Sequence, residues 1–242
     1  YFFSFKQENQ KIHLITYGDK NYIRSKQRIN NEAINSNWFH NITIYGPEDL
    51  NKDFKNEFND ILKQPRGGGY WIWKFDIIKQ QLTKINKSDI LIYLDAGCSI
   101  NINGKKRFYE YIEMLNNSNE TIISFKMNHN EICYTIKELL QQFDIDEPKQ
   151  FMATILIMKN TEKMMKIIDE CINILRKDHL LVTDHYNKIG QCKEFKDNRH
   201  DQSILSLVRK KYGSIILKDE TYFKAFGNDE SKKFPFWATR KK

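Results

Sequence analysis

The chain has 242 residues, of which 40% are hydrophobic and 13% aromatic. These values exclude a disordered chain and suit a single domain large enough to bury a substantial core. A formal net charge of +8 leaves polyanions open as partners, among them nucleic acid, anionic membrane surfaces and nucleotide diphosphates.

The densest basic clusters are Lys105–Arg107, Arg209–Lys211 and Arg240–Lys242. Because they are scattered along the chain, two interpretations stay open. They are either a solvated lysine-rich surface with a loose C-terminal tail, or parts of a binding groove.

Hydrophobic spacing and turn residues predict alternating strands and helices. In chain order, the predicted elements are a strand at Lys11–Thr16, a helix at Tyr22–Asn35, a strand at Phe39–Tyr45, a helix opened by Gly46 and Pro47, a helix at Trp71–Ile85, a strand at Ile90–Leu94, a helix at Arg107–Leu115, strands at Thr121–Phe125 and Phe151–Met158, a helix through Met164–Leu175, a helix at Gln202–Tyr212 and a strand at Ser214–Leu217. The run Ile90–Leu94 is continuously apolar, which is typical of a strand buried on both faces. The pattern predicts an α/β fold with a mostly parallel central sheet and helices on both faces.

Polar residues follow two of the predicted strands, where open α/β sheets bind their ligands. After the first strand come Thr16, Tyr17, Gly18 and Asp19, whose ring could stack on a base and whose carboxylate could accept a hydrogen bond from base or ribose. After the buried strand comes Asp95, which could hold a divalent cation on a diphosphate. A turn or N-cap carboxylate explains Asp95 equally well.

The segment Arg66–Lys74 contains three consecutive glycines and three aromatic residues. The glycines let the backbone approach a ligand, and the following helix could offer free N–H groups to an anion. Arg66 and Lys74 could face phosphate, and the aromatic rings of Tyr70, Trp71 and Trp73 could form a sugar or base platform. The alternative is a flexible hinge before a core helix. The segment is not a P-loop, because no Gly-Lys-Ser/Thr follows.

A third polar cluster, Asn198–Ser203, precedes an apolar helix. Asp201 or Ser203 could simply cap that helix. A run of Arg199, His200 and Asp201 is also typical of an active-site wall. No motif for a serine or cysteine nucleophile is present.

Four motifs in this order resemble those of small GT-A-type glycosyltransferases from bacterial surface-polysaccharide clusters and large DNA viruses. They are Tyr17-Gly18-Asp19, Arg66–Lys74, Tyr93–Cys98 and Arg199–Leu207, and the resemblance spans residues 12–217. It implies one domain over 1–242, with a nucleotide-sugar-binding half at about 12–100, an acceptor and catalytic half at about 101–217 and a tail at 218–242.

The resemblance also implies a nucleoside-diphosphate sugar as donor, commonly UDP-linked, and a divalent cation, usually Mn²⁺, near Asp95. It places His200 and Asp201 at the catalytic centre, near sugar and acceptor. The implied donor-binding residues are Thr16, Tyr17, Asp19, Arg66, Gly68, Gly69, Tyr70, Trp73, Lys74, Asp95, Ala96, Gly97 and Gln202.

One departure concerns the metal. The usual motif is Asp-x-Asp, but residue 97 is glycine. The metal is therefore held by Asp95 with another group such as His200, or it is weakly bound or dispensable. In the last case, lysine and arginine would neutralise the leaving diphosphate.

We therefore expect transfer of a sugar to a hydroxyl of a glycan or glycoprotein, with Asp201 as general base if the reaction inverts. The alternatives are a catalytically weak sugar-nucleotide-binding protein and a basic module for polyanions or nucleic acid, although no specific nucleic acid is predicted. Cys98, Cys133, Cys171 and Cys192 form no CxxC pair, which favours a reducing compartment. Tyr1–Phe5 is too short for a secretory signal, and no apolar run is long enough to span a bilayer. A cytoplasmic location is expected, with membrane contact through the basic tail left open.

Overall fold

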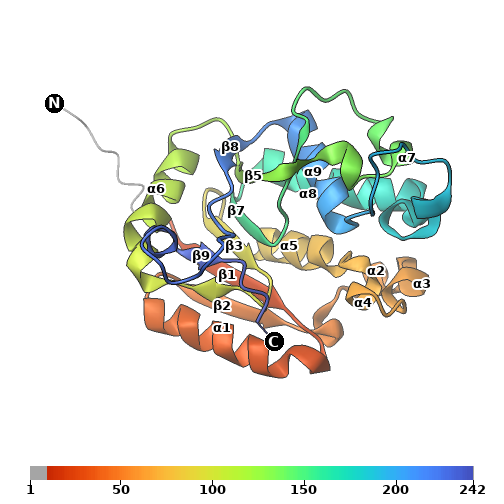
Figure 1. Cartoon of the computed structure of the whole chain (residues 1–242). Helices are drawn as coiled ribbons and strands as arrows, with labels where there is room; N and C mark the ends of the chain where they lie inside the picture. The colour runs from red at the N-terminus through yellow and green to blue at the C-terminus, as the bar shows by residue number, and fades with distance from the viewer. Residues whose placement is uncertain (1–9, 242) are drawn as a thin grey trace.

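The computed structural model describes residues 10–241, so Tyr1–Phe5 and Lys242 lie outside the described residues. Strands and helices alternate through most of the chain (Figure 1). The strands are β1 (Ile12–Tyr17), β2 (Asn41–Tyr45), β3 (Ile90–Leu94), β4 (Ser99–Ile100), β5 (Ile122–Asn130), β6 (Lys149–Phe151), β7 (Ile155–Lys159), β8 (Ile215–Lys218) and β9 (Phe236–Trp237). The α-helices are α1 (Ile23–Ser36), α2 (Lys52–Glu57), α3 (Asn59–Leu62), α4 (Gly67–Tyr70), α5 (Trp73–Lys84), α6 (Lys105–Asn116), α7 (Lys137–Leu140), α8 (Glu162–Lys177) and α9 (Asp201–Tyr212).

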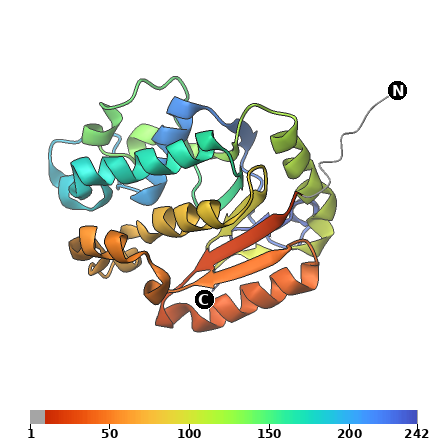
Figure 2. The same cartoon turned by 180° about the vertical axis from the view of Figure 1, so that it is seen from behind.

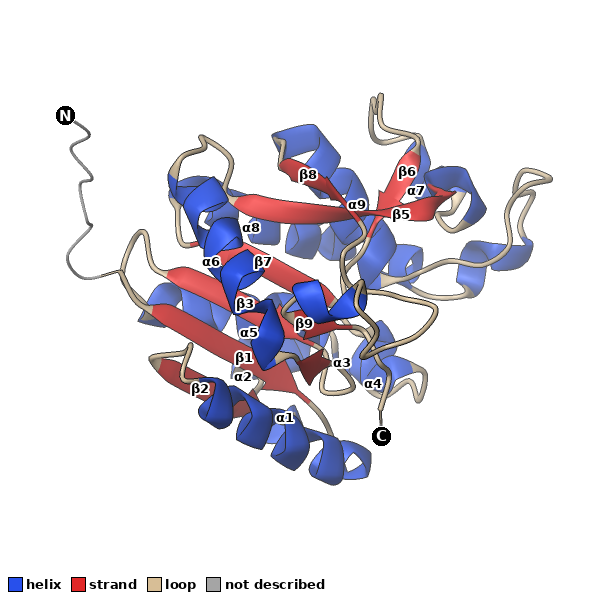
Figure 3. Ribbon diagram, turned by 60° about the vertical axis from the view of Figure 1, so that its left-hand side comes forward, coloured by secondary structure: helices blue, strands red, loops and turns tan. Residues whose placement is uncertain are grey.

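The main sheet has seven strands in the order β2-β1-β3-β7-β5-β6, with β8 on the other edge of β5 (Figure 3). β1 pairs in parallel with β2 and β3, and β5 pairs in parallel with β8. β7 runs antiparallel to both β3 and β5, and β6 runs antiparallel to β5. Five of the seven strands therefore point the same way, which confirms the predicted α/β fold with a mostly parallel sheet.

Helices cover both faces of this sheet and enclose one core on each. On one face, α5, α8 and α9 pack against alternate residues of the central strands, and α5 lies beside α8 (Figure 2). On the other face, α1 and α6 pack against the remaining residues of the same strands. All five residues of β3 are buried, as its continuous apolar sequence predicts.

Two predicted elements are divided. The helix expected after Gly46 is a 3₁₀ turn (Pro47–Asp49) followed by α2 and α3, because Asn51 accepts hydrogen bonds from the next backbone N–H groups and starts a new helix. The single strand expected at Phe151–Met158 is β6 and β7, because the chain crosses there from the edge of β5 to the gap between β3 and β5.

The residues after 218 were expected to form a tail, but residues 236–241 pack against the sheet edge. β9 pairs with β4, and the Lys241 N–H donates to the carbonyl of Gly97 at 2.9 Å. Phe236 is only 1% exposed and lies in the core beneath α6. The interpretation of a loose tail is therefore wrong for this segment.

The second basic cluster is also largely internal. Arg209 is fully buried, and Lys210 forms an ion pair of 2.6 Å with the buried Glu131. Of the cysteines, all free thiols, Cys98 and Cys171 are buried whereas Cys192 is exposed. Within residues 10–241, every helix is too short or too polar to cross a membrane.

Candidate active site

The residues that follow β1 and β3 meet at one edge of the sheet. The parallel register sets Ile15 of β1 opposite Tyr93 of β3. Two residues further along each strand, Tyr17 is therefore level with Asp95. Adjacent strands lie about 4.8 Å apart, so the two polar segments predicted from the sequence are neighbours.

A buried ammonium lies between two carboxylates at this edge. Lys74, on the first turn of α5, has its Nζ 2.5 Å from Oδ2 of Asp201 and 3.6 Å from Oδ1 of Asp95. The same Nζ donates to the carbonyl of Ala153 at 3.1 Å and lies 5.0 Å from the centre of the Tyr93 ring. Residues far apart in the sequence thus form one ion cluster, which we call the Asp95–Lys74–Asp201 cluster.

The two carboxylates of this cluster have different surroundings. The Asp95 side chain is 33% exposed and accepts a hydrogen bond from the Tyr93 hydroxyl, whereas that of Asp201 is only 7% exposed. Burial raises the pKa of Asp201 to about 6, although Lys74 works against this rise. Burial opposes the charge of Lys74, but Asp201 and Asp95 more than offset it and raise the pKa of the lysine.

These contacts decide between some of the alternative interpretations. Asp201 is the first residue of α9 and not its N-cap, and the N-cap residue makes no side-chain capping bond. The Asp95 side chain contacts Tyr93 and Lys74, so its role is more than that of a turn carboxylate. Lys74 could face phosphate by its sequence, whereas in the structure its ammonium is buried against these acids.

Tyr17 and Trp73 stack on each other, with ring centroids 3.8 Å apart and planes 15° apart. They are 7% and 6% exposed, so most of each ring is covered in this structure. Thr16 is fully buried, and its hydroxyl lacks a hydrogen-bond partner among the described residues. The Asp19 side chain accepts from the backbone of Asn21 at 2.8 Å and caps a short 3₁₀ turn.

The glycine-rich segment, labelled α4, is a left-handed turn and not a right-handed α-helix. Five consecutive residues, from Gly67 to Trp71, have positive φ angles between 52° and 95°. Three glycines carry this conformation without a Cβ penalty, whereas Tyr70 and Trp71 each adopt it at a cost of about 1–2 kcal/mol. The N–H groups of Gly68 and Gly69 donate to the carbonyls of Pro65 and Gln64. In the helix that follows, where free N–H groups for an anion were predicted, those of Lys74 and Phe75 already donate to the carbonyls of Trp71 and Ile72.

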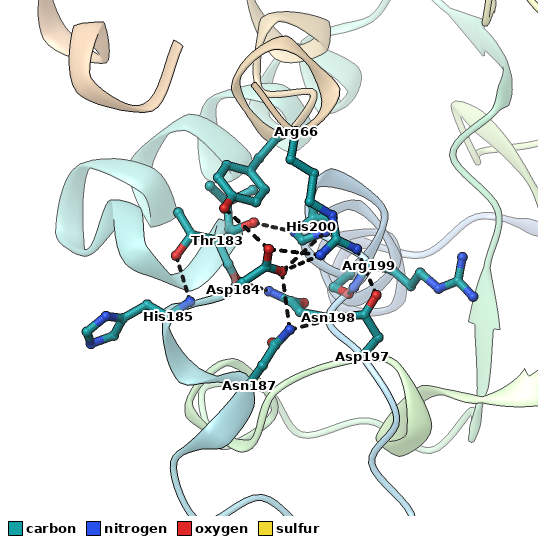
Figure 4. A network of polar contacts seen from close by, with 12 residues as sticks. Arg66, Thr183, Asp184, His185, Asn187, Asp197, Asn198, Arg199 and His200 are labelled. Atoms are coloured by element: carbon teal, nitrogen blue, oxygen red, sulfur yellow. Dashed lines mark hydrogen bonds and ion pairs between the residues drawn. The ribbon is translucent and has the colours of Figure 1, made fainter. Parts of the chain in front are cut away.

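Arg66 joins this turn to the loop before α9 (Figure 4). Its guanidinium donates to both carboxylate oxygens of Asp184 and to Asp197, each at 2.8 Å. Tyr70 adds a hydrogen bond from its hydroxyl to Asp184 at 3.3 Å. Arg66, expected to face phosphate, is thus held by two acids while its side chain stays 42% exposed. The sequence interpretation missed both acids, although Asp197 lies two residues before the Arg199–Asp201 run.

His200 lies in this network and not beside Asp95. Its Nδ1 is 2.7 Å from the carbonyl of Val182, which makes this nitrogen the protonated one in the neutral ring. Its ring stacks on Trp71, and burial lowers the pKa of the imidazole. The other nitrogen, Nε2, is buried without a hydrogen bond and lies 3.8 Å from Asp184. His200 has a backbone φ of 57° and ψ of −119°, outside the helical range, and α9 begins directly after it at Asp201.

The remaining predicted donor residues surround the ion cluster through backbone contacts. Gln202 accepts from the Ala153 N–H at 3.2 Å. The carbonyl of Ala96 accepts from Arg28 at 2.9 Å, and that of Gly97 accepts from the C-terminal segment. In residues 10–241, no three His, Cys, Asp or Glu side chains lie close enough together to coordinate one metal ion.

Known protein structures resemble the fold of this chain. By sequence, neither a protein-family model nor a curated protein matches the chain. By structure, it is similar to a glycosyltransferase involved in glycosylation of the major capsid of PBCV-1, with a TM-score of 0.55 and 13% identity, covering 94% of this chain and 92% of the other. It is also similar to the bifunctional glycosyltransferase WbbM, with a TM-score of 0.51 and 12% identity, covering 88% of this chain and 40% of the other. The chain has a GT-A glycosyltransferase fold. In this GT-A fold, the Asp95–Lys74–Asp201 cluster lies at the carboxyl edge of the parallel strands, where such sheets place their ligands.

Proposed function

We propose that the chain transfers a sugar from a nucleoside-diphosphate sugar, UDP-linked, to a hydroxyl of a glycan or glycoprotein. The observation that carries this proposal is the Asp95–Lys74–Asp201 cluster at the carboxyl edge of the sheet. The GT-A fold supports the class of reaction. Charged groups held out of water in this way act strongly on charge that develops during a reaction.

The donor would lie across the ends of β1 and β3, with its base near Thr16, Tyr17 and Asp19 and its diphosphate near Asp95. The unpartnered, buried hydroxyl of Thr16 supports a polar ligand at the first strand end. Base stacking on Tyr17 would require the ring of Trp73 to shift. The glycine turn, Arg66 and Tyr70 would border the sugar, and Gln202 would lie near the acceptor.

The charge of the cluster bears on the divalent cation. Two carboxylates and one ammonium leave a net charge of −1 when all three are ionised, which would repel a diphosphate. The half-buried carboxylate of Asp95 fits a cation held by one protein ligand and by diphosphate oxygens, as is common for Mg²⁺ sites. Such a cation, Mn²⁺ or Mg²⁺, would neutralise the leaving diphosphate. We propose Asp95 as its protein ligand.

Proton transfer from the acceptor hydroxyl would fall to Asp201 in an inverting reaction. A base works best when its pKa lies near the working pH, and burial brings the pKa of Asp201 to about 6. Because its carboxylate is bound to Lys74, the ammonium would have to release it in the complex. Burial lowers the pKa of His200, which favours the neutral ring, and its Nε2 would act on the acceptor side.

A module for nucleic acid is the rival from another class. It requires an extended basic groove with exposed aromatic rings. Burial of the Arg209 and Lys210 side chains removes two of the three residues of one basic cluster from the surface, which counts against that function.

Thermal unfolding in the presence of UDP-sugars and GDP-sugars, each with and without Mn²⁺, tests the proposal. A donor at a hundred times its Kd stabilises the fold by about 2.7 kcal/mol, which raises Tm by about 5–10 °C for a chain of this size. Asp95→Asn should abolish the part of the shift that depends on Mn²⁺. Asp169→Asn, which removes an exposed partner of Lys79 (2.7 Å), is the matched control and should leave the shift unchanged.

Donors that raise Tm are then assayed for hydrolysis and for transfer to a hydroxyl acceptor. A shift without hydrolysis or transfer would indicate a sugar-nucleotide-binding protein. No shift with any donor, together with tight and salt-dependent binding of oligonucleotides, would overturn the proposal. Full transfer activity in Asp201→Asn would remove Asp201 from the role of base.

A further inference from the structure

At the end of the sheet opposite to β2, β8 lies beside β5 (Figure 3). A cavity of about 350 Å³ lies where β8 ends. None of the residues predicted for the donor site lines it. Its polar and aromatic lining consists of Lys126, Asn128, Lys149, Lys218, Asp219 and Tyr222. The volume is at the lower end of the range for small-molecule sites, which suits one or two sugar rings.

The lining combines positive charge with one exposed aromatic ring. Lys218 is exposed, and Lys149 donates to the carbonyl of Asn128 at 2.8 Å without using an acid. Lys126 lies 3.4 Å from Glu147, which offsets part of the charge. Asp219 also lines the cavity: its Oδ1 accepts hydrogen bonds from the backbone and hydroxyl of Thr221, and its charge remains. When all are ionised, the three lysines against Glu147 and Asp219 leave a net charge of +1. The cavity is therefore suited to an anionic group.

Tyr222 supplies an apolar surface beside these cations. Its side chain is 60% exposed, the joint highest value among the large exposed hydrophobic residues of the described chain. An exposed tyrosine ring has an apolar face and a polar hydroxyl, which is the combination that a sugar ring with its own apolar and polar faces requires.

The strand register places this cavity at the same edge of the sheet as Asp95. Leu91 of β3 and Ile122 of β5 both pair with Met158 of β7. Counting four residues along each strand, Lys126 is level with Asp95, and two strand spacings correspond to about 10 Å. A ligand in the cavity would lie on the side of the ion cluster away from β1, where the donor is proposed to bind.

Hydrogen bonds also connect the cavity to the Asp95–Lys74–Asp201 cluster. Lys149 precedes Gln150, whose Oε1 accepts from Nε2 of Gln202 at 2.7 Å. Gln202 is the neighbour of Asp201 and accepts from the backbone of Ala153, the residue whose carbonyl binds Lys74. A ligand bound to Lys149 would therefore be connected, through Gln150 and Gln202, to the carboxylate proposed as base.

We propose that this cavity binds an anionic sugar residue of the acceptor glycan, one that carries a carboxylate or a phosphate. The role as an acceptor site rests on the proposed function, whereas binding itself does not. The anionic group would meet the ammonium groups of Lys126 and Lys218, and the sugar ring would lie on Tyr222. A single aromatic ring in a small cavity favours one sugar residue over a nucleic-acid strand, which uses several stacking rings along a groove.

The test is an NMR titration of the labelled protein with glucuronic acid, glucose 6-phosphate and, as the uncharged probe, glucose. We expect shifts at the cavity residues with one or both anionic probes and none with glucose. Lys218→Glu and Tyr222→Ala should each weaken that binding about tenfold or more, as expected from losing one charge-assisted contact or the ring surface. Lys106→Glu, whose side chain is 93% exposed on α6, is the control for charge and should leave binding unchanged.

Which anionic probe binds distinguishes carboxylate from phosphate, and either one supports the inference. Binding of glucose equal to that of the charged probes, or no binding of any probe, would overturn it. A short oligo-dT strand that binds through the same lysines more tightly than the anionic sugars would also overturn it, in favour of nucleic acid. Titration with a UDP-sugar in parallel separates the two proposals, because donor binding at Asp95 can succeed or fail independently of this cavity.

Discussion

Replacing Lys74 by methionine removes the ammonium that lies between two acids and keeps most of the side-chain volume. In the wild type, this ammonium is 2.5 Å from Asp201, whose side chain is only 7% exposed. Breaking a buried ion pair by removing one partner costs about 3–5 kcal/mol, because the other charge stays buried without compensation. With a urea dependence of about 2–3 kcal/mol per molar, the unfolding midpoint should fall by about 1–2 M.

The loss should depend on pH in a defined direction. Burial and Asp95 raise the pKa of Asp201, and Lys74 lowers it, so the variant should have a pKa for Asp201 above the wild-type value of about 6. Above that pKa the carboxylate is charged in the folded variant, and the full loss is present. As the pH falls through it, protonation discharges Asp201 and the difference from wild type shrinks. Urea unfolding followed by circular dichroism at about pH 8 and about pH 5 measures both values.

Lys79→Met is a matched control on the same helix. Lys79 pairs with Asp169 at 2.7 Å, but both side chains are about 40% exposed, so its loss should cost no more than about 1 kcal/mol. Adding Asp201→Asn to Lys74→Met should recover part of the loss, since the uncompensated charge is then absent. If Lys74→Met costs no more than the control at about pH 8, or costs the same at both pH values, Lys74 does not compensate a buried charge.

Three further predictions concern other parts of the site. Gly69→Ala should lower the unfolding free energy by about 2–4 kcal/mol, because φ is 95° and the new Cβ would lie 2.7 Å from the backbone of α3. Gly227→Ala, with φ at 87° and open space around it, should cost only about 1–2 kcal/mol, and equal losses in urea unfolding would show that the close contact is unimportant. Arg66→Gln should change stability by less than about 1 kcal/mol but speed amide hydrogen exchange in residues 183–200, and unchanged exchange would contradict a role in holding that loop. If Asp201 is the base, kcat/KM should fall as the pH drops through about 6, because the protonated carboxyl cannot accept a proton, whereas a flat profile down to about pH 5 would count against it.

The fold was largely predictable where local sequence decides the structure. The continuous apolar run Ile90–Leu94 and the spacing of apolar residues in α1 and α8 each specify one element. The break between β6 and β7 was not predictable, because residues 151–158 are almost uniformly apolar and nothing in them marks the crossing. That crossing is set by strand pairing with β3 and β5, which are distant in sequence.

In the site too, positions set by local sequence were predictable, whereas contacts between distant segments were not. Asp95 could be predicted because it directly follows a buried strand, and parallel pairing then brings it level with Tyr17. The pairing of Lys74 with Asp201 spans 127 residues, and sequence patterns carry no information on such a contact. Lys74 was therefore assigned to phosphate, when its ammonium in fact lies among the acids. For a similar reason, the sequence did not reveal that Arg209 and Lys210 are buried, since a run of charged residues does not show which of them face the core.

The left-handed turn at Gly67–Trp71 has a consequence for folding kinetics. Local interactions disfavour it, because two of its five residues, Tyr70 and Trp71, are not glycine and a positive φ costs each of them about 1–2 kcal/mol. What holds it comes from far away in the chain, such as the contact from Arg66 to Asp184, 118 residues later, and the stacking of Trp71 on His200. Contacts of such long range form after the loop between them has closed. We expect substitutions in this turn to accelerate unfolding while leaving the refolding rate nearly unchanged, so that the most recognisable segment of the sequence is among the last to take its shape.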